Sequence, residues 1–374
     1  MDLSSEDSLR LNVLLHQDVE AIRIDDSKMV VYGLSPRGEA QVPLNPNCRD
    51  EQYIKKVKEV ISSHILGSPG GYPIFLRRWT RMGQAKDDSL ERLLKLGEPE
   101  AVVAVVHAAG LTDELARRAW WAMPNSDNAR RMLEKQSVVE GQMGRTLASF
   151  LVEFLPFEED PKNMLESVRL VLQPGLIDEA TRDSLWSRGQ RKNAFYVGFL
   201  KMLPDTLPEQ TAAHPEYESL KARLTDLADA DQRVSRQLLR VLSPAGQAYI
   251  KTAMTVFKKP ANQDVVVALL EAIESYFTTV CPAAPSSSDM NELVTQASQA
   301  CTDKSIPEIK EVLEMAPETE ALLQSMLALS WVGVHLVNPI FSRTDAIGTV
   351  MRRKLEPVTV PILDLLRTLS GKRA

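Results

Sequence analysis

From about Ser89 to the carboxyl end, the sequence is a succession of short helical segments that each end at proline or glycine. Single segments run for roughly 10–15 residues, the usual length of helices in globular proteins. No alternation of apolar and polar residues, which would mark a strand, interrupts them. The pattern predicts a mainly α-helical array, either a HEAT-like solenoid or a closed bundle. Breaks fall at Gly97-Glu98-Pro99, Gly110, Pro124, Pro156, Pro174-Gly175, Pro204 to Pro208, Pro215, Pro244 and Pro260.

The first 72 residues have a different pattern, which predicts a small α+β unit. A short opening helix is followed by three strands in a meander, joined by turn-forming residues such as those of Ser35 to Gly38. In the third strand Pro43 cannot donate a ladder hydrogen bond, so this strand is expected at an edge. The expected helix covers Leu9 to Leu15, and the expected strands cover Val19 to Ile24, Met29 to Leu34 and Glu39 to Leu44.

A longer helix follows, with Asp50 as its expected cap and apolar residues at helical spacing. It lies across the meander and ends in the glycine- and proline-rich stretch of residues 67–71. The sequence therefore predicts a first domain over residues 1–72 and a helical array over residues 73–280.

A run rich in proline and serine, Pro282 to Ser288, predicts a linker before a carboxyl-terminal helical subdomain over residues 281–374. Within that subdomain the apolar stretch Met326 to Phe341 is expected to form a buried helix, because it is too short and too polar to span a membrane. The last helix, Ala346 to Leu369, is expected to be interrupted at Pro357 and Pro361.

One internal similarity links two helix starts. The residues Val106, Gly110, Leu111, Asp113, Glu114, Arg117 and Trp121 recur at a constant offset as Val171, Gly175, Leu176, Asp178, Glu179, Arg182 and Trp186. Two such copies fit every second hairpin of a solenoid, but similar helix-start signals also arise by chance. The sequence leaves both explanations open.

Bulk composition favours a soluble cytoplasmic protein. The net charge of −6 argues against a general nucleic-acid binder but leaves room for a local basic patch. The amino terminus has acids before its first apolar residues and no basic region, unlike a secretory signal. The three cysteines show no CxxC spacing, so neither a disulfide framework nor a thiolate zinc site is expected.

The strongest basic cluster comes directly after the glycine-rich stretch. Arg77, Arg78 and Arg81 surround Trp79, a combination that can bind phosphate or stack on an RNA base. The alternative, which we favour, is a structural hinge in which the tryptophan packs and the arginines pair with acids.

A second binding candidate is the adjacent pair Trp120 and Trp121. Neighbouring residues on a helix point about 100° apart, so both rings need not be fully buried. An exposed tryptophan next to Arg117 and Arg118 would make a hot spot for a protein partner. Packing of both rings between helices is the alternative that we favour.

Cys48 is the candidate for chemistry, because it lies just before a predicted helix start with Arg49 beside it. Helix amides and a nearby cation lower the pKa of a thiol, which would suit a persulfide-carrying cysteine. An ordinary loop thiol is the more economical interpretation, since Asp50 and Glu51 oppose that positive field.

The sequence contains no motif that assembles a nucleophile, a base and an oxyanion site. The histidines are scattered without metal-ligand spacing. We therefore expect no enzyme activity, no cofactor, no metal and no small-molecule substrate. A protein partner is the first expectation, RNA the second, and a membrane is not expected.

Four segments resemble the DsrS proteins, the soluble "sulfur reduction protein" family encoded with dissimilatory sulfite reductase genes. They are LGSPGGYPIFLRRWTRMGQ (Leu66–Gln84), LLKLGEPEAVVAVV (Leu93–Val106), GLTDELARRAWWAMP (Gly110–Pro124) and LVLQPGLIDEATRDSLW (Leu170–Trp186). The resemblance covers the first half of the chain better than the second and contains no chemical motif.

This resemblance implies a cytoplasmic accessory or adaptor role in dissimilatory sulfur oxidation, which includes regulating expression of the sulfur-oxidation genes through protein or RNA binding. It carries over no catalytic residue. The alternative is a sulfur carrier that holds persulfide on Cys48.

Overall fold

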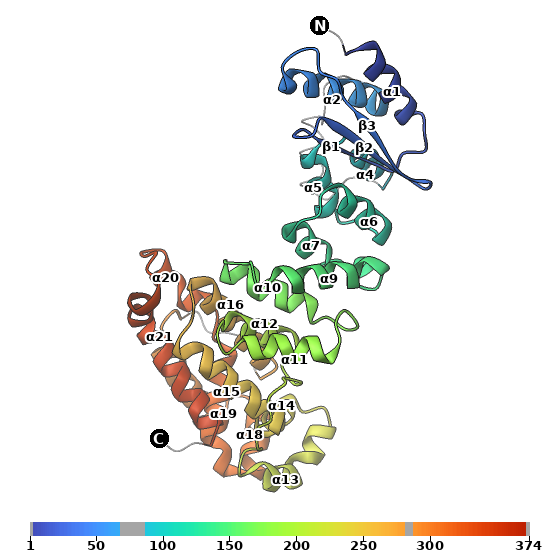
Figure 1. Cartoon of the computed structure of the whole chain (residues 1–374). Helices are drawn as coiled ribbons and strands as arrows, with labels where there is room; N and C mark the ends of the chain where they lie inside the picture. The colour runs from blue at the N-terminus through green and yellow to red at the C-terminus, as the bar shows by residue number, and fades with distance from the viewer. Residues whose placement is uncertain (1–2, 68–86, 281–286, 372–374) are drawn as a thin grey trace. The chain divides into compact units, whose positions relative to one another are not determined.

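The computed structural model describes residues 3–67, 87–280 and 287–371. These residues are mainly helical, with one three-stranded antiparallel sheet near the amino terminus, so the predicted fold class is confirmed (Figure 1). The chain divides into two compact units, Met1–Phe154 (unit 1) and Leu155–Ala374 (unit 2). The boundaries predicted near residues 72 and 281 fall outside the described residues, and the three-domain division stays a prediction.

The sheet of unit 1 is the meander that the sequence predicts. Strands β1 (Ala21–Asp25), β2 (Val30–Ser35) and β3 (Gly38–Pro43) pair in that order, with Ile22 opposite Gly33 and Val31 opposite Val42. Within the described sheet β3 lies at an edge, as Pro43 requires.

Helices α1 (Ser5–Leu15) and α2 (Asp50–Leu66) cover one face of this sheet (Figure 1). Their apolar residues form one core with the sheet, in which Leu11, Ile22, Val31 and Val57 have no exposed surface. A Cβ at Gly33 would lie 2.8 Å from a methyl carbon of Leu14, so glycine is what allows α1 to come this close.

The predicted cap of α2 is wrong. Asp50 is the first residue of the helix, and Arg49, which makes no side-chain capping bond, occupies the N-cap position. Asp50 still favours the helix, because an acid in the first turn complements the positive end of the helix dipole.

The rest of unit 1 is helical, and helices α4 and α6 contact β1. These helices are α4 (Asp87–Leu94), α5 (Pro99–His107), α6 (Asp113–Ala122), α7 (Ser126–Met132), α8 (Gln136–Val139) and α9 (Gln142–Phe154).

The regular elements among the described residues of unit 2 are all helices. Its first helices are α10 (Pro161–Val171), α11 (Glu179–Arg188), α12 (Ala194–Met202), α13 (Tyr217–Asp229), α14 (Arg233–Leu242), α15 (Pro244–Lys258) and α16 (Gln263–Phe277). The remainder are α17 (Met290–Thr302), α18 (Pro307–Met315), η1 (Pro317–Thr319), α19 (Glu320–Ser330), η2 (Val334–Leu336), α20 (Asn338–Phe341) and α21 (Gly348–Leu369).

Helix α12 lies at the centre of a group of helices in unit 2. Its residues from Ala194 to Leu200 are all buried, and α10, α11, α15 and α16 pack against it. A Cβ at Gly198 would come within 2.9 Å of the Leu165 carbonyl oxygen, so the glycine sets how closely α10 and α12 approach. A helix that is apolar on every side has to be surrounded in this way.

Two predictions for the carboxyl-terminal helices are wrong. Helix α21 runs through Pro357 and Pro361 without interruption. Its buried face, which includes Leu355, Ile362 and Leu366, packs on α15, α17 and α19, and this packing outweighs the missing backbone bonds. The apolar stretch Met326 to Phe341 is not one helix, because α19 ends at Ser330 and two short helices follow.

The Tyr53 hydroxyl donates a hydrogen bond to the fully buried carboxylate of Asp7. This carboxylate also accepts a hydrogen bond from the backbone N–H of Asn45, at 2.7 Å. We predict that Tyr53→Phe lowers the free energy of unfolding by about 1–3 kcal/mol, because a buried carboxylate loses a donor. Urea unfolding measures this. Tyr32→Phe is the matched control, and equal losses in the two variants would contradict the prediction.

Candidate functional site

Trp121, one of the predicted hot-spot residues, joins α6 to the second face of the sheet. Its indole nitrogen donates to Glu39 at 2.8 Å. The Arg23 guanidinium lies 5.1 Å from the Trp121 ring centroid and 4.7 Å from that of Tyr32, so it is held between two aromatic faces. The half-buried Trp121 therefore takes part in the packing of unit 1.

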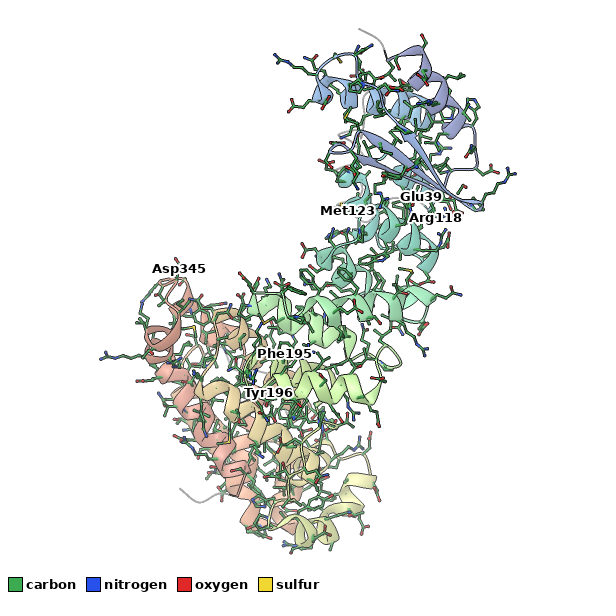
Figure 2. The ribbon with its side chains drawn as sticks, in the orientation of Figure 1. Glu39, Arg118, Met123, Phe195, Tyr196 and Asp345 are labelled. Atoms are coloured by element: carbon green, nitrogen blue, oxygen red, sulfur yellow. The ribbon has the colours of Figure 1, made fainter. Side chains whose placement is uncertain are left out.

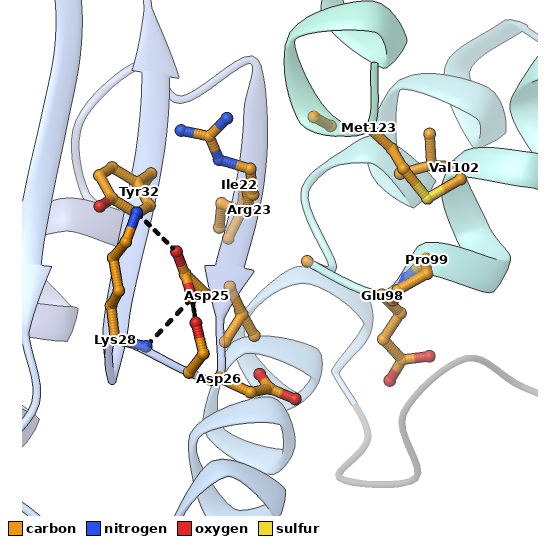
Figure 3. Close-up of a pocket in the computed structure, with 14 residues that line it drawn as sticks. Ile22, Arg23, Asp25, Asp26, Lys28, Tyr32, Glu98, Pro99, Val102 and Met123 are labelled. Carbon is orange, nitrogen blue, oxygen red and sulfur yellow. Dashed lines mark hydrogen bonds and ion pairs between the residues drawn. The ribbon is translucent and has the colours of Figure 1, made fainter. Parts of the chain in front are cut away.

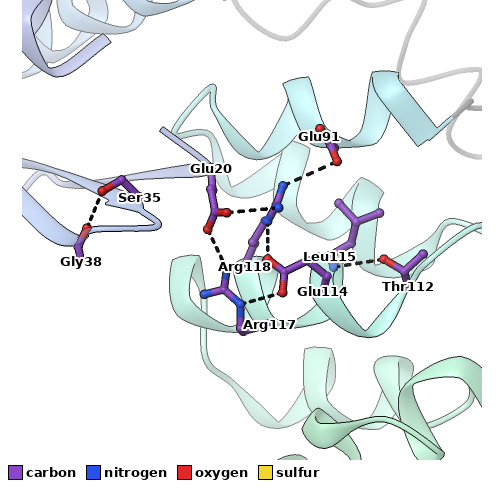
Figure 4. A network of polar contacts seen from close by, with 9 residues as sticks. All are labelled: Glu20, Ser35, Gly38, Glu91, Thr112, Glu114, Leu115, Arg117 and Arg118. Atoms are coloured by element: carbon purple, nitrogen blue, oxygen red, sulfur yellow. Dashed lines mark hydrogen bonds and ion pairs between the residues drawn. The ribbon is translucent and has the colours of Figure 1, made fainter. Parts of the chain in front are cut away.

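The two arginines of α6 complete this contact through a carboxylate network (Figure 4). Arg117 and Arg118 both reach Glu20, at 2.7 and 3.3 Å, and both bond to Glu114 on their own helix. Arg118 also lies 3.6 Å from Glu91 of α4. The network neutralises the cations that the hot-spot hypothesis would present to a partner.

Trp120 points to a different neighbour. Its ring meets Phe150 of α9 edge to face, with the centroids 4.8 Å apart, and it is half-buried. Packing between elements of unit 1 thus accounts for the described contacts of both tryptophans. A role of Trp120 or Trp121 in partner binding stays a prediction.

A groove of about 550 Å³ opens near Trp121 (Figure 3). It lies between the β1–β2 turn, the start of α5 and the end of α6. Its apolar wall includes Val102 and Met123. Three of its charged side chains, Arg23, Asp25 and Lys28, already have partners. Asp25 accepts from the Ser27 hydroxyl and lies 3.3 Å from Lys28, and Arg23 is held as described above. These three side chains therefore give no reason to expect a charged ligand in this groove.

Hydrogen bonding from Arg117 is the main cause that lowers the pKa of Glu114 from its usual 4.5 to about 2. A carboxyl whose pKa is lower in the folded state stabilises the fold above its unfolded pKa and loses that effect as pH falls. We predict that the stability difference between the wild type and Glu114→Gln is constant above pH 4.5 and shrinks as the pH falls towards 2. Because this carboxylate is half-exposed, solvent screening keeps the difference small. Urea unfolding across this pH range tests it, and a difference that does not change with pH would contradict it.

A larger concave site of about 710 Å³ lies within unit 2, where helices α10, α12 and α21 begin and α15 ends. We call it the basic groove. Figure 2 labels Tyr196, one of its residues, among the helices of this unit. Its floor is mainly apolar and includes Pro161, Met164, Tyr196, Pro260 and Ala261.

Four cationic side chains from three separate segments line the basic groove: Arg191, Lys192, Lys259 and Arg352. None of them forms an ion pair with a carboxylate of the described residues. Lys192 donates to the backbone oxygen of Glu158 at 3.4 Å, and Arg352 donates to the Thr349 hydroxyl at 2.9 Å. A cleft with charges of one sign focuses its field on whatever enters it.

Several other described arginines of unit 2 are neutralised. Arg240, for example, binds Asp205 through two hydrogen bonds of 2.7 and 2.8 Å. Arginines with a carboxylate partner in this unit are Arg169, Arg182, Arg223, Arg233, Arg236, Arg240 and Arg367. Arg188, Arg343 and Arg353 also have no carboxylate partner among the described residues, so what distinguishes the basic groove is that four such cations line one concave site.

Cys48 lies one residue before the N-cap of α2 and is half-buried against the core of unit 1. Its sulfur is 3.8 Å from the Arg49 carbonyl oxygen, which is its neighbour in sequence. Cys301 is the contrasting thiol, because its burial raises the pKa to about 11. Cys48 is thus the more accessible of these two free cysteines.

The predicted cluster Arg77, Arg78, Trp79 and Arg81 lies outside the described residues. Its role in binding phosphate or RNA stays a prediction.

The two copies of the internal similarity have different local structures. In the first, Thr112 caps α6 and the Asp113 carboxylate accepts the amides of Gln142 and Met143, at the start of α9. In the second, Asp178 itself caps α11. Similar residues therefore make different contacts at the two helix starts.

Sequence reasoning missed the basic groove. Its cations are far apart in the chain, and only the run from Arg352 to Lys354 is visible as a basic cluster. The pair Arg191 and Lys192 directly before an apolar helix was the other available signal.

Across residues 3–67, 87–280 and 287–371, no helix is long and apolar enough to cross a membrane. In the same residues no group of three or more His, Cys, Asp or Glu side chains is placed to hold a metal ion. No family model, curated protein or solved structure matches this chain.

Proposed function

We propose that the chain is a non-enzymatic adaptor that binds a protein partner and serves as a cytoplasmic accessory protein of dissimilatory sulfur oxidation. The sulfur context rests on the resemblance to the DsrS proteins in the segments Leu66–Gln84, Leu93–Val106, Gly110–Pro124 and Leu170–Trp186. A role in regulating the sulfur-oxidation genes would follow from which partner is bound.

The observation that carries the binding part of this proposal is the basic groove. A concave surface of about 710 Å³ is within the range of roughly 300–1,000 Å³ that binding sites occupy. Its four cations, which have no carboxylate partner among the described residues, repel one another, and a partner with negative charge would relieve this repulsion.

The residue types in the basic groove favour binding over catalysis. Among the described residues that line it, none is Asp, Glu, His or Cys, the usual general bases and acids. The polar groups present are amides, hydroxyls and cations, which orient a ligand but do not by themselves accept a proton at neutral pH.

We predict that the tagged chain, purified from sulfur-oxidising cells grown on sulfur, retains a specific protein that survives ribonuclease treatment. The double variant Lys192→Glu, Lys259→Glu should lose that protein, because it reverses two charges of the basic groove. The control Arg37→Glu, Lys55→Glu makes the same charge change at exposed sites of unit 1 and should retain it.

Mass spectrometry and RNA sequencing of the purified material provide the measurement. A partner equally retained by both double variants would contradict the assignment to the groove. Enrichment of RNA alone would shift the site to Arg77, Arg78 and Arg81, and recovery of nothing above background would end the adaptor proposal.

The half-exposed thiol of Cys48 supports a second candidate function, that of a persulfide carrier. Here we predict that the Cys48 thiolate attacks a sulfane sulfur of added polysulfide, forming a persulfide while the shortened polysulfide leaves. The buried Cys301 should stay unmodified, because its raised pKa keeps that thiol protonated. Peptide mass spectrometry distinguishes the two sites. An unmodified Cys48, under conditions that load a known carrier, would exclude this function.

A further inference from the structure

We infer that the basic groove binds an acidic segment of a partner protein, in which carboxylates flank one apolar side chain. This inference rests on the proposed adaptor function and adds the chemistry of the partner. It follows from the charges at the rim of the groove, from its floor and from the residues that adjoin it.

The rim supplies positive charge from several directions. Arg191 and Lys192 come from the segment between α11 and α12, Lys259 follows α15, and Arg352 belongs to α21. None pairs with a described carboxylate, so the carboxylates of an incoming segment are the counter-charges that this geometry accommodates.

Backbone dipoles add to this field. Helices α12 and α21 begin at groove residues, Ala194 and Gly348, and neither helix has a side-chain cap. No side chain therefore competes with an anion at these helix starts, although the Phe195 amide of α12 already donates to the Lys192 carbonyl oxygen at 3.0 Å. Lys258 and Lys259 offset the opposite, negative end of α15.

The floor supplies an apolar seat with one polar group. Tyr196 is nine-tenths buried, and its hydroxyl has no hydrogen-bond partner among the described residues. Burial raises the pKa of Tyr196, so the phenol stays protonated and can donate to a carboxylate or carbonyl oxygen. The surrounding Met164 and Pro260 would contact an apolar side chain of the bound segment.

Two exposed apolar residues adjoin the start of α21. Ile347 is 71% exposed and Val350 is 58% exposed, on either side of Gly348. They extend the apolar surface past the groove, as expected where a peptide longer than the groove itself is bound.

The same features argue against a nucleic acid as the occupant. Proteins that bind single strands stack bases on exposed aromatic rings. Among the described residues that line the groove, the aromatic residue is Tyr196, whose ring is buried. The net charge of −6 also opposes a polyanion more strongly than a short acidic peptide.

The test uses the full chain and a fluorescein-labelled peptide with one central leucine flanked by glutamates, followed by anisotropy. Binding should weaken with salt and should fall about tenfold or more in Arg191→Glu, Arg352→Glu. The control Arg37→Glu, Lys55→Glu should bind as the wild type does. A peptide with serine in place of leucine should bind more weakly than the leucine peptide, because it has no apolar anchor.

Lys192→Glu, Lys259→Glu is the second variant, since both side chains are exposed and their replacement leaves the core intact. Thermal unfolding of each variant confirms its fold. Unchanged peptide affinity in both groove variants would overturn the inference, and so would a uridine oligonucleotide that displaces the peptide. If the peptide binds but cells yield no partner, the adaptor function fails and the groove chemistry stands. If cells yield a partner but the peptide does not bind, the adaptor function stands and the groove chemistry fails.

Discussion

From Ala194 to Leu200, helix α12 has no polar face. This absence determines how the neighbouring helices of unit 2 pack around it. All residues from Ala194 to Leu200 are buried, so helices must cover α12 on every side. Gly198 sets the distance to α10, and Trp186 of α11 packs on Tyr196 and Phe199 with centroids 4.6 and 5.0 Å away. Charged residues are absent from Ala194 to Leu200 and lie at the two ends of this stretch, at Arg191 and Lys192 before it and at Lys201 in the last turn of the helix.

This arrangement explains how four cations that lack a described carboxylate partner come to line one groove of unit 2. The start of α12 meets the starts of α10 and α21 and the end of α15, and each of these positions tolerates exposed polar groups. In unit 1 the cations where α6 meets the sheet are satisfied internally, since Arg23 lies between two rings and Arg117 and Arg118 share Glu20. The contrast between neutralised and unneutralised cations is the physical basis for assigning binding to the basic groove.

Local patterns were enough to predict the sheet and the two helices that cover it, but not all of their ends. Alternation and turn residues gave the three strands, and Pro43 gave the edge. The cap of α2 was wrong because Arg49 takes that position without a side-chain bond. The helix that passes through Pro357 and Pro361 could not be predicted locally, because tertiary packing of its apolar face overrides the propensity of proline.

The site was harder to predict than the fold. Trp121 was a candidate hot spot from its neighbours in sequence, with packing as the favoured alternative. Its described contacts are with Glu39 and Arg23, both distant in the chain, and these partners could not be read from the sequence. The cations of the basic groove come together only because helices from Pro161 to Leu369 pack around one another. A sequence gives the charge of each residue but not which charges lack a partner.

The most direct test of this account is hydrogen–deuterium exchange of the full chain with and without its captured partner. The account predicts slower exchange in the three segments that carry the cations of the basic groove, residues 189–196, 255–261 and 348–352, with little change in α1, α2 and the sheet. Protection confined to unit 1, or none in these three segments, would contradict it.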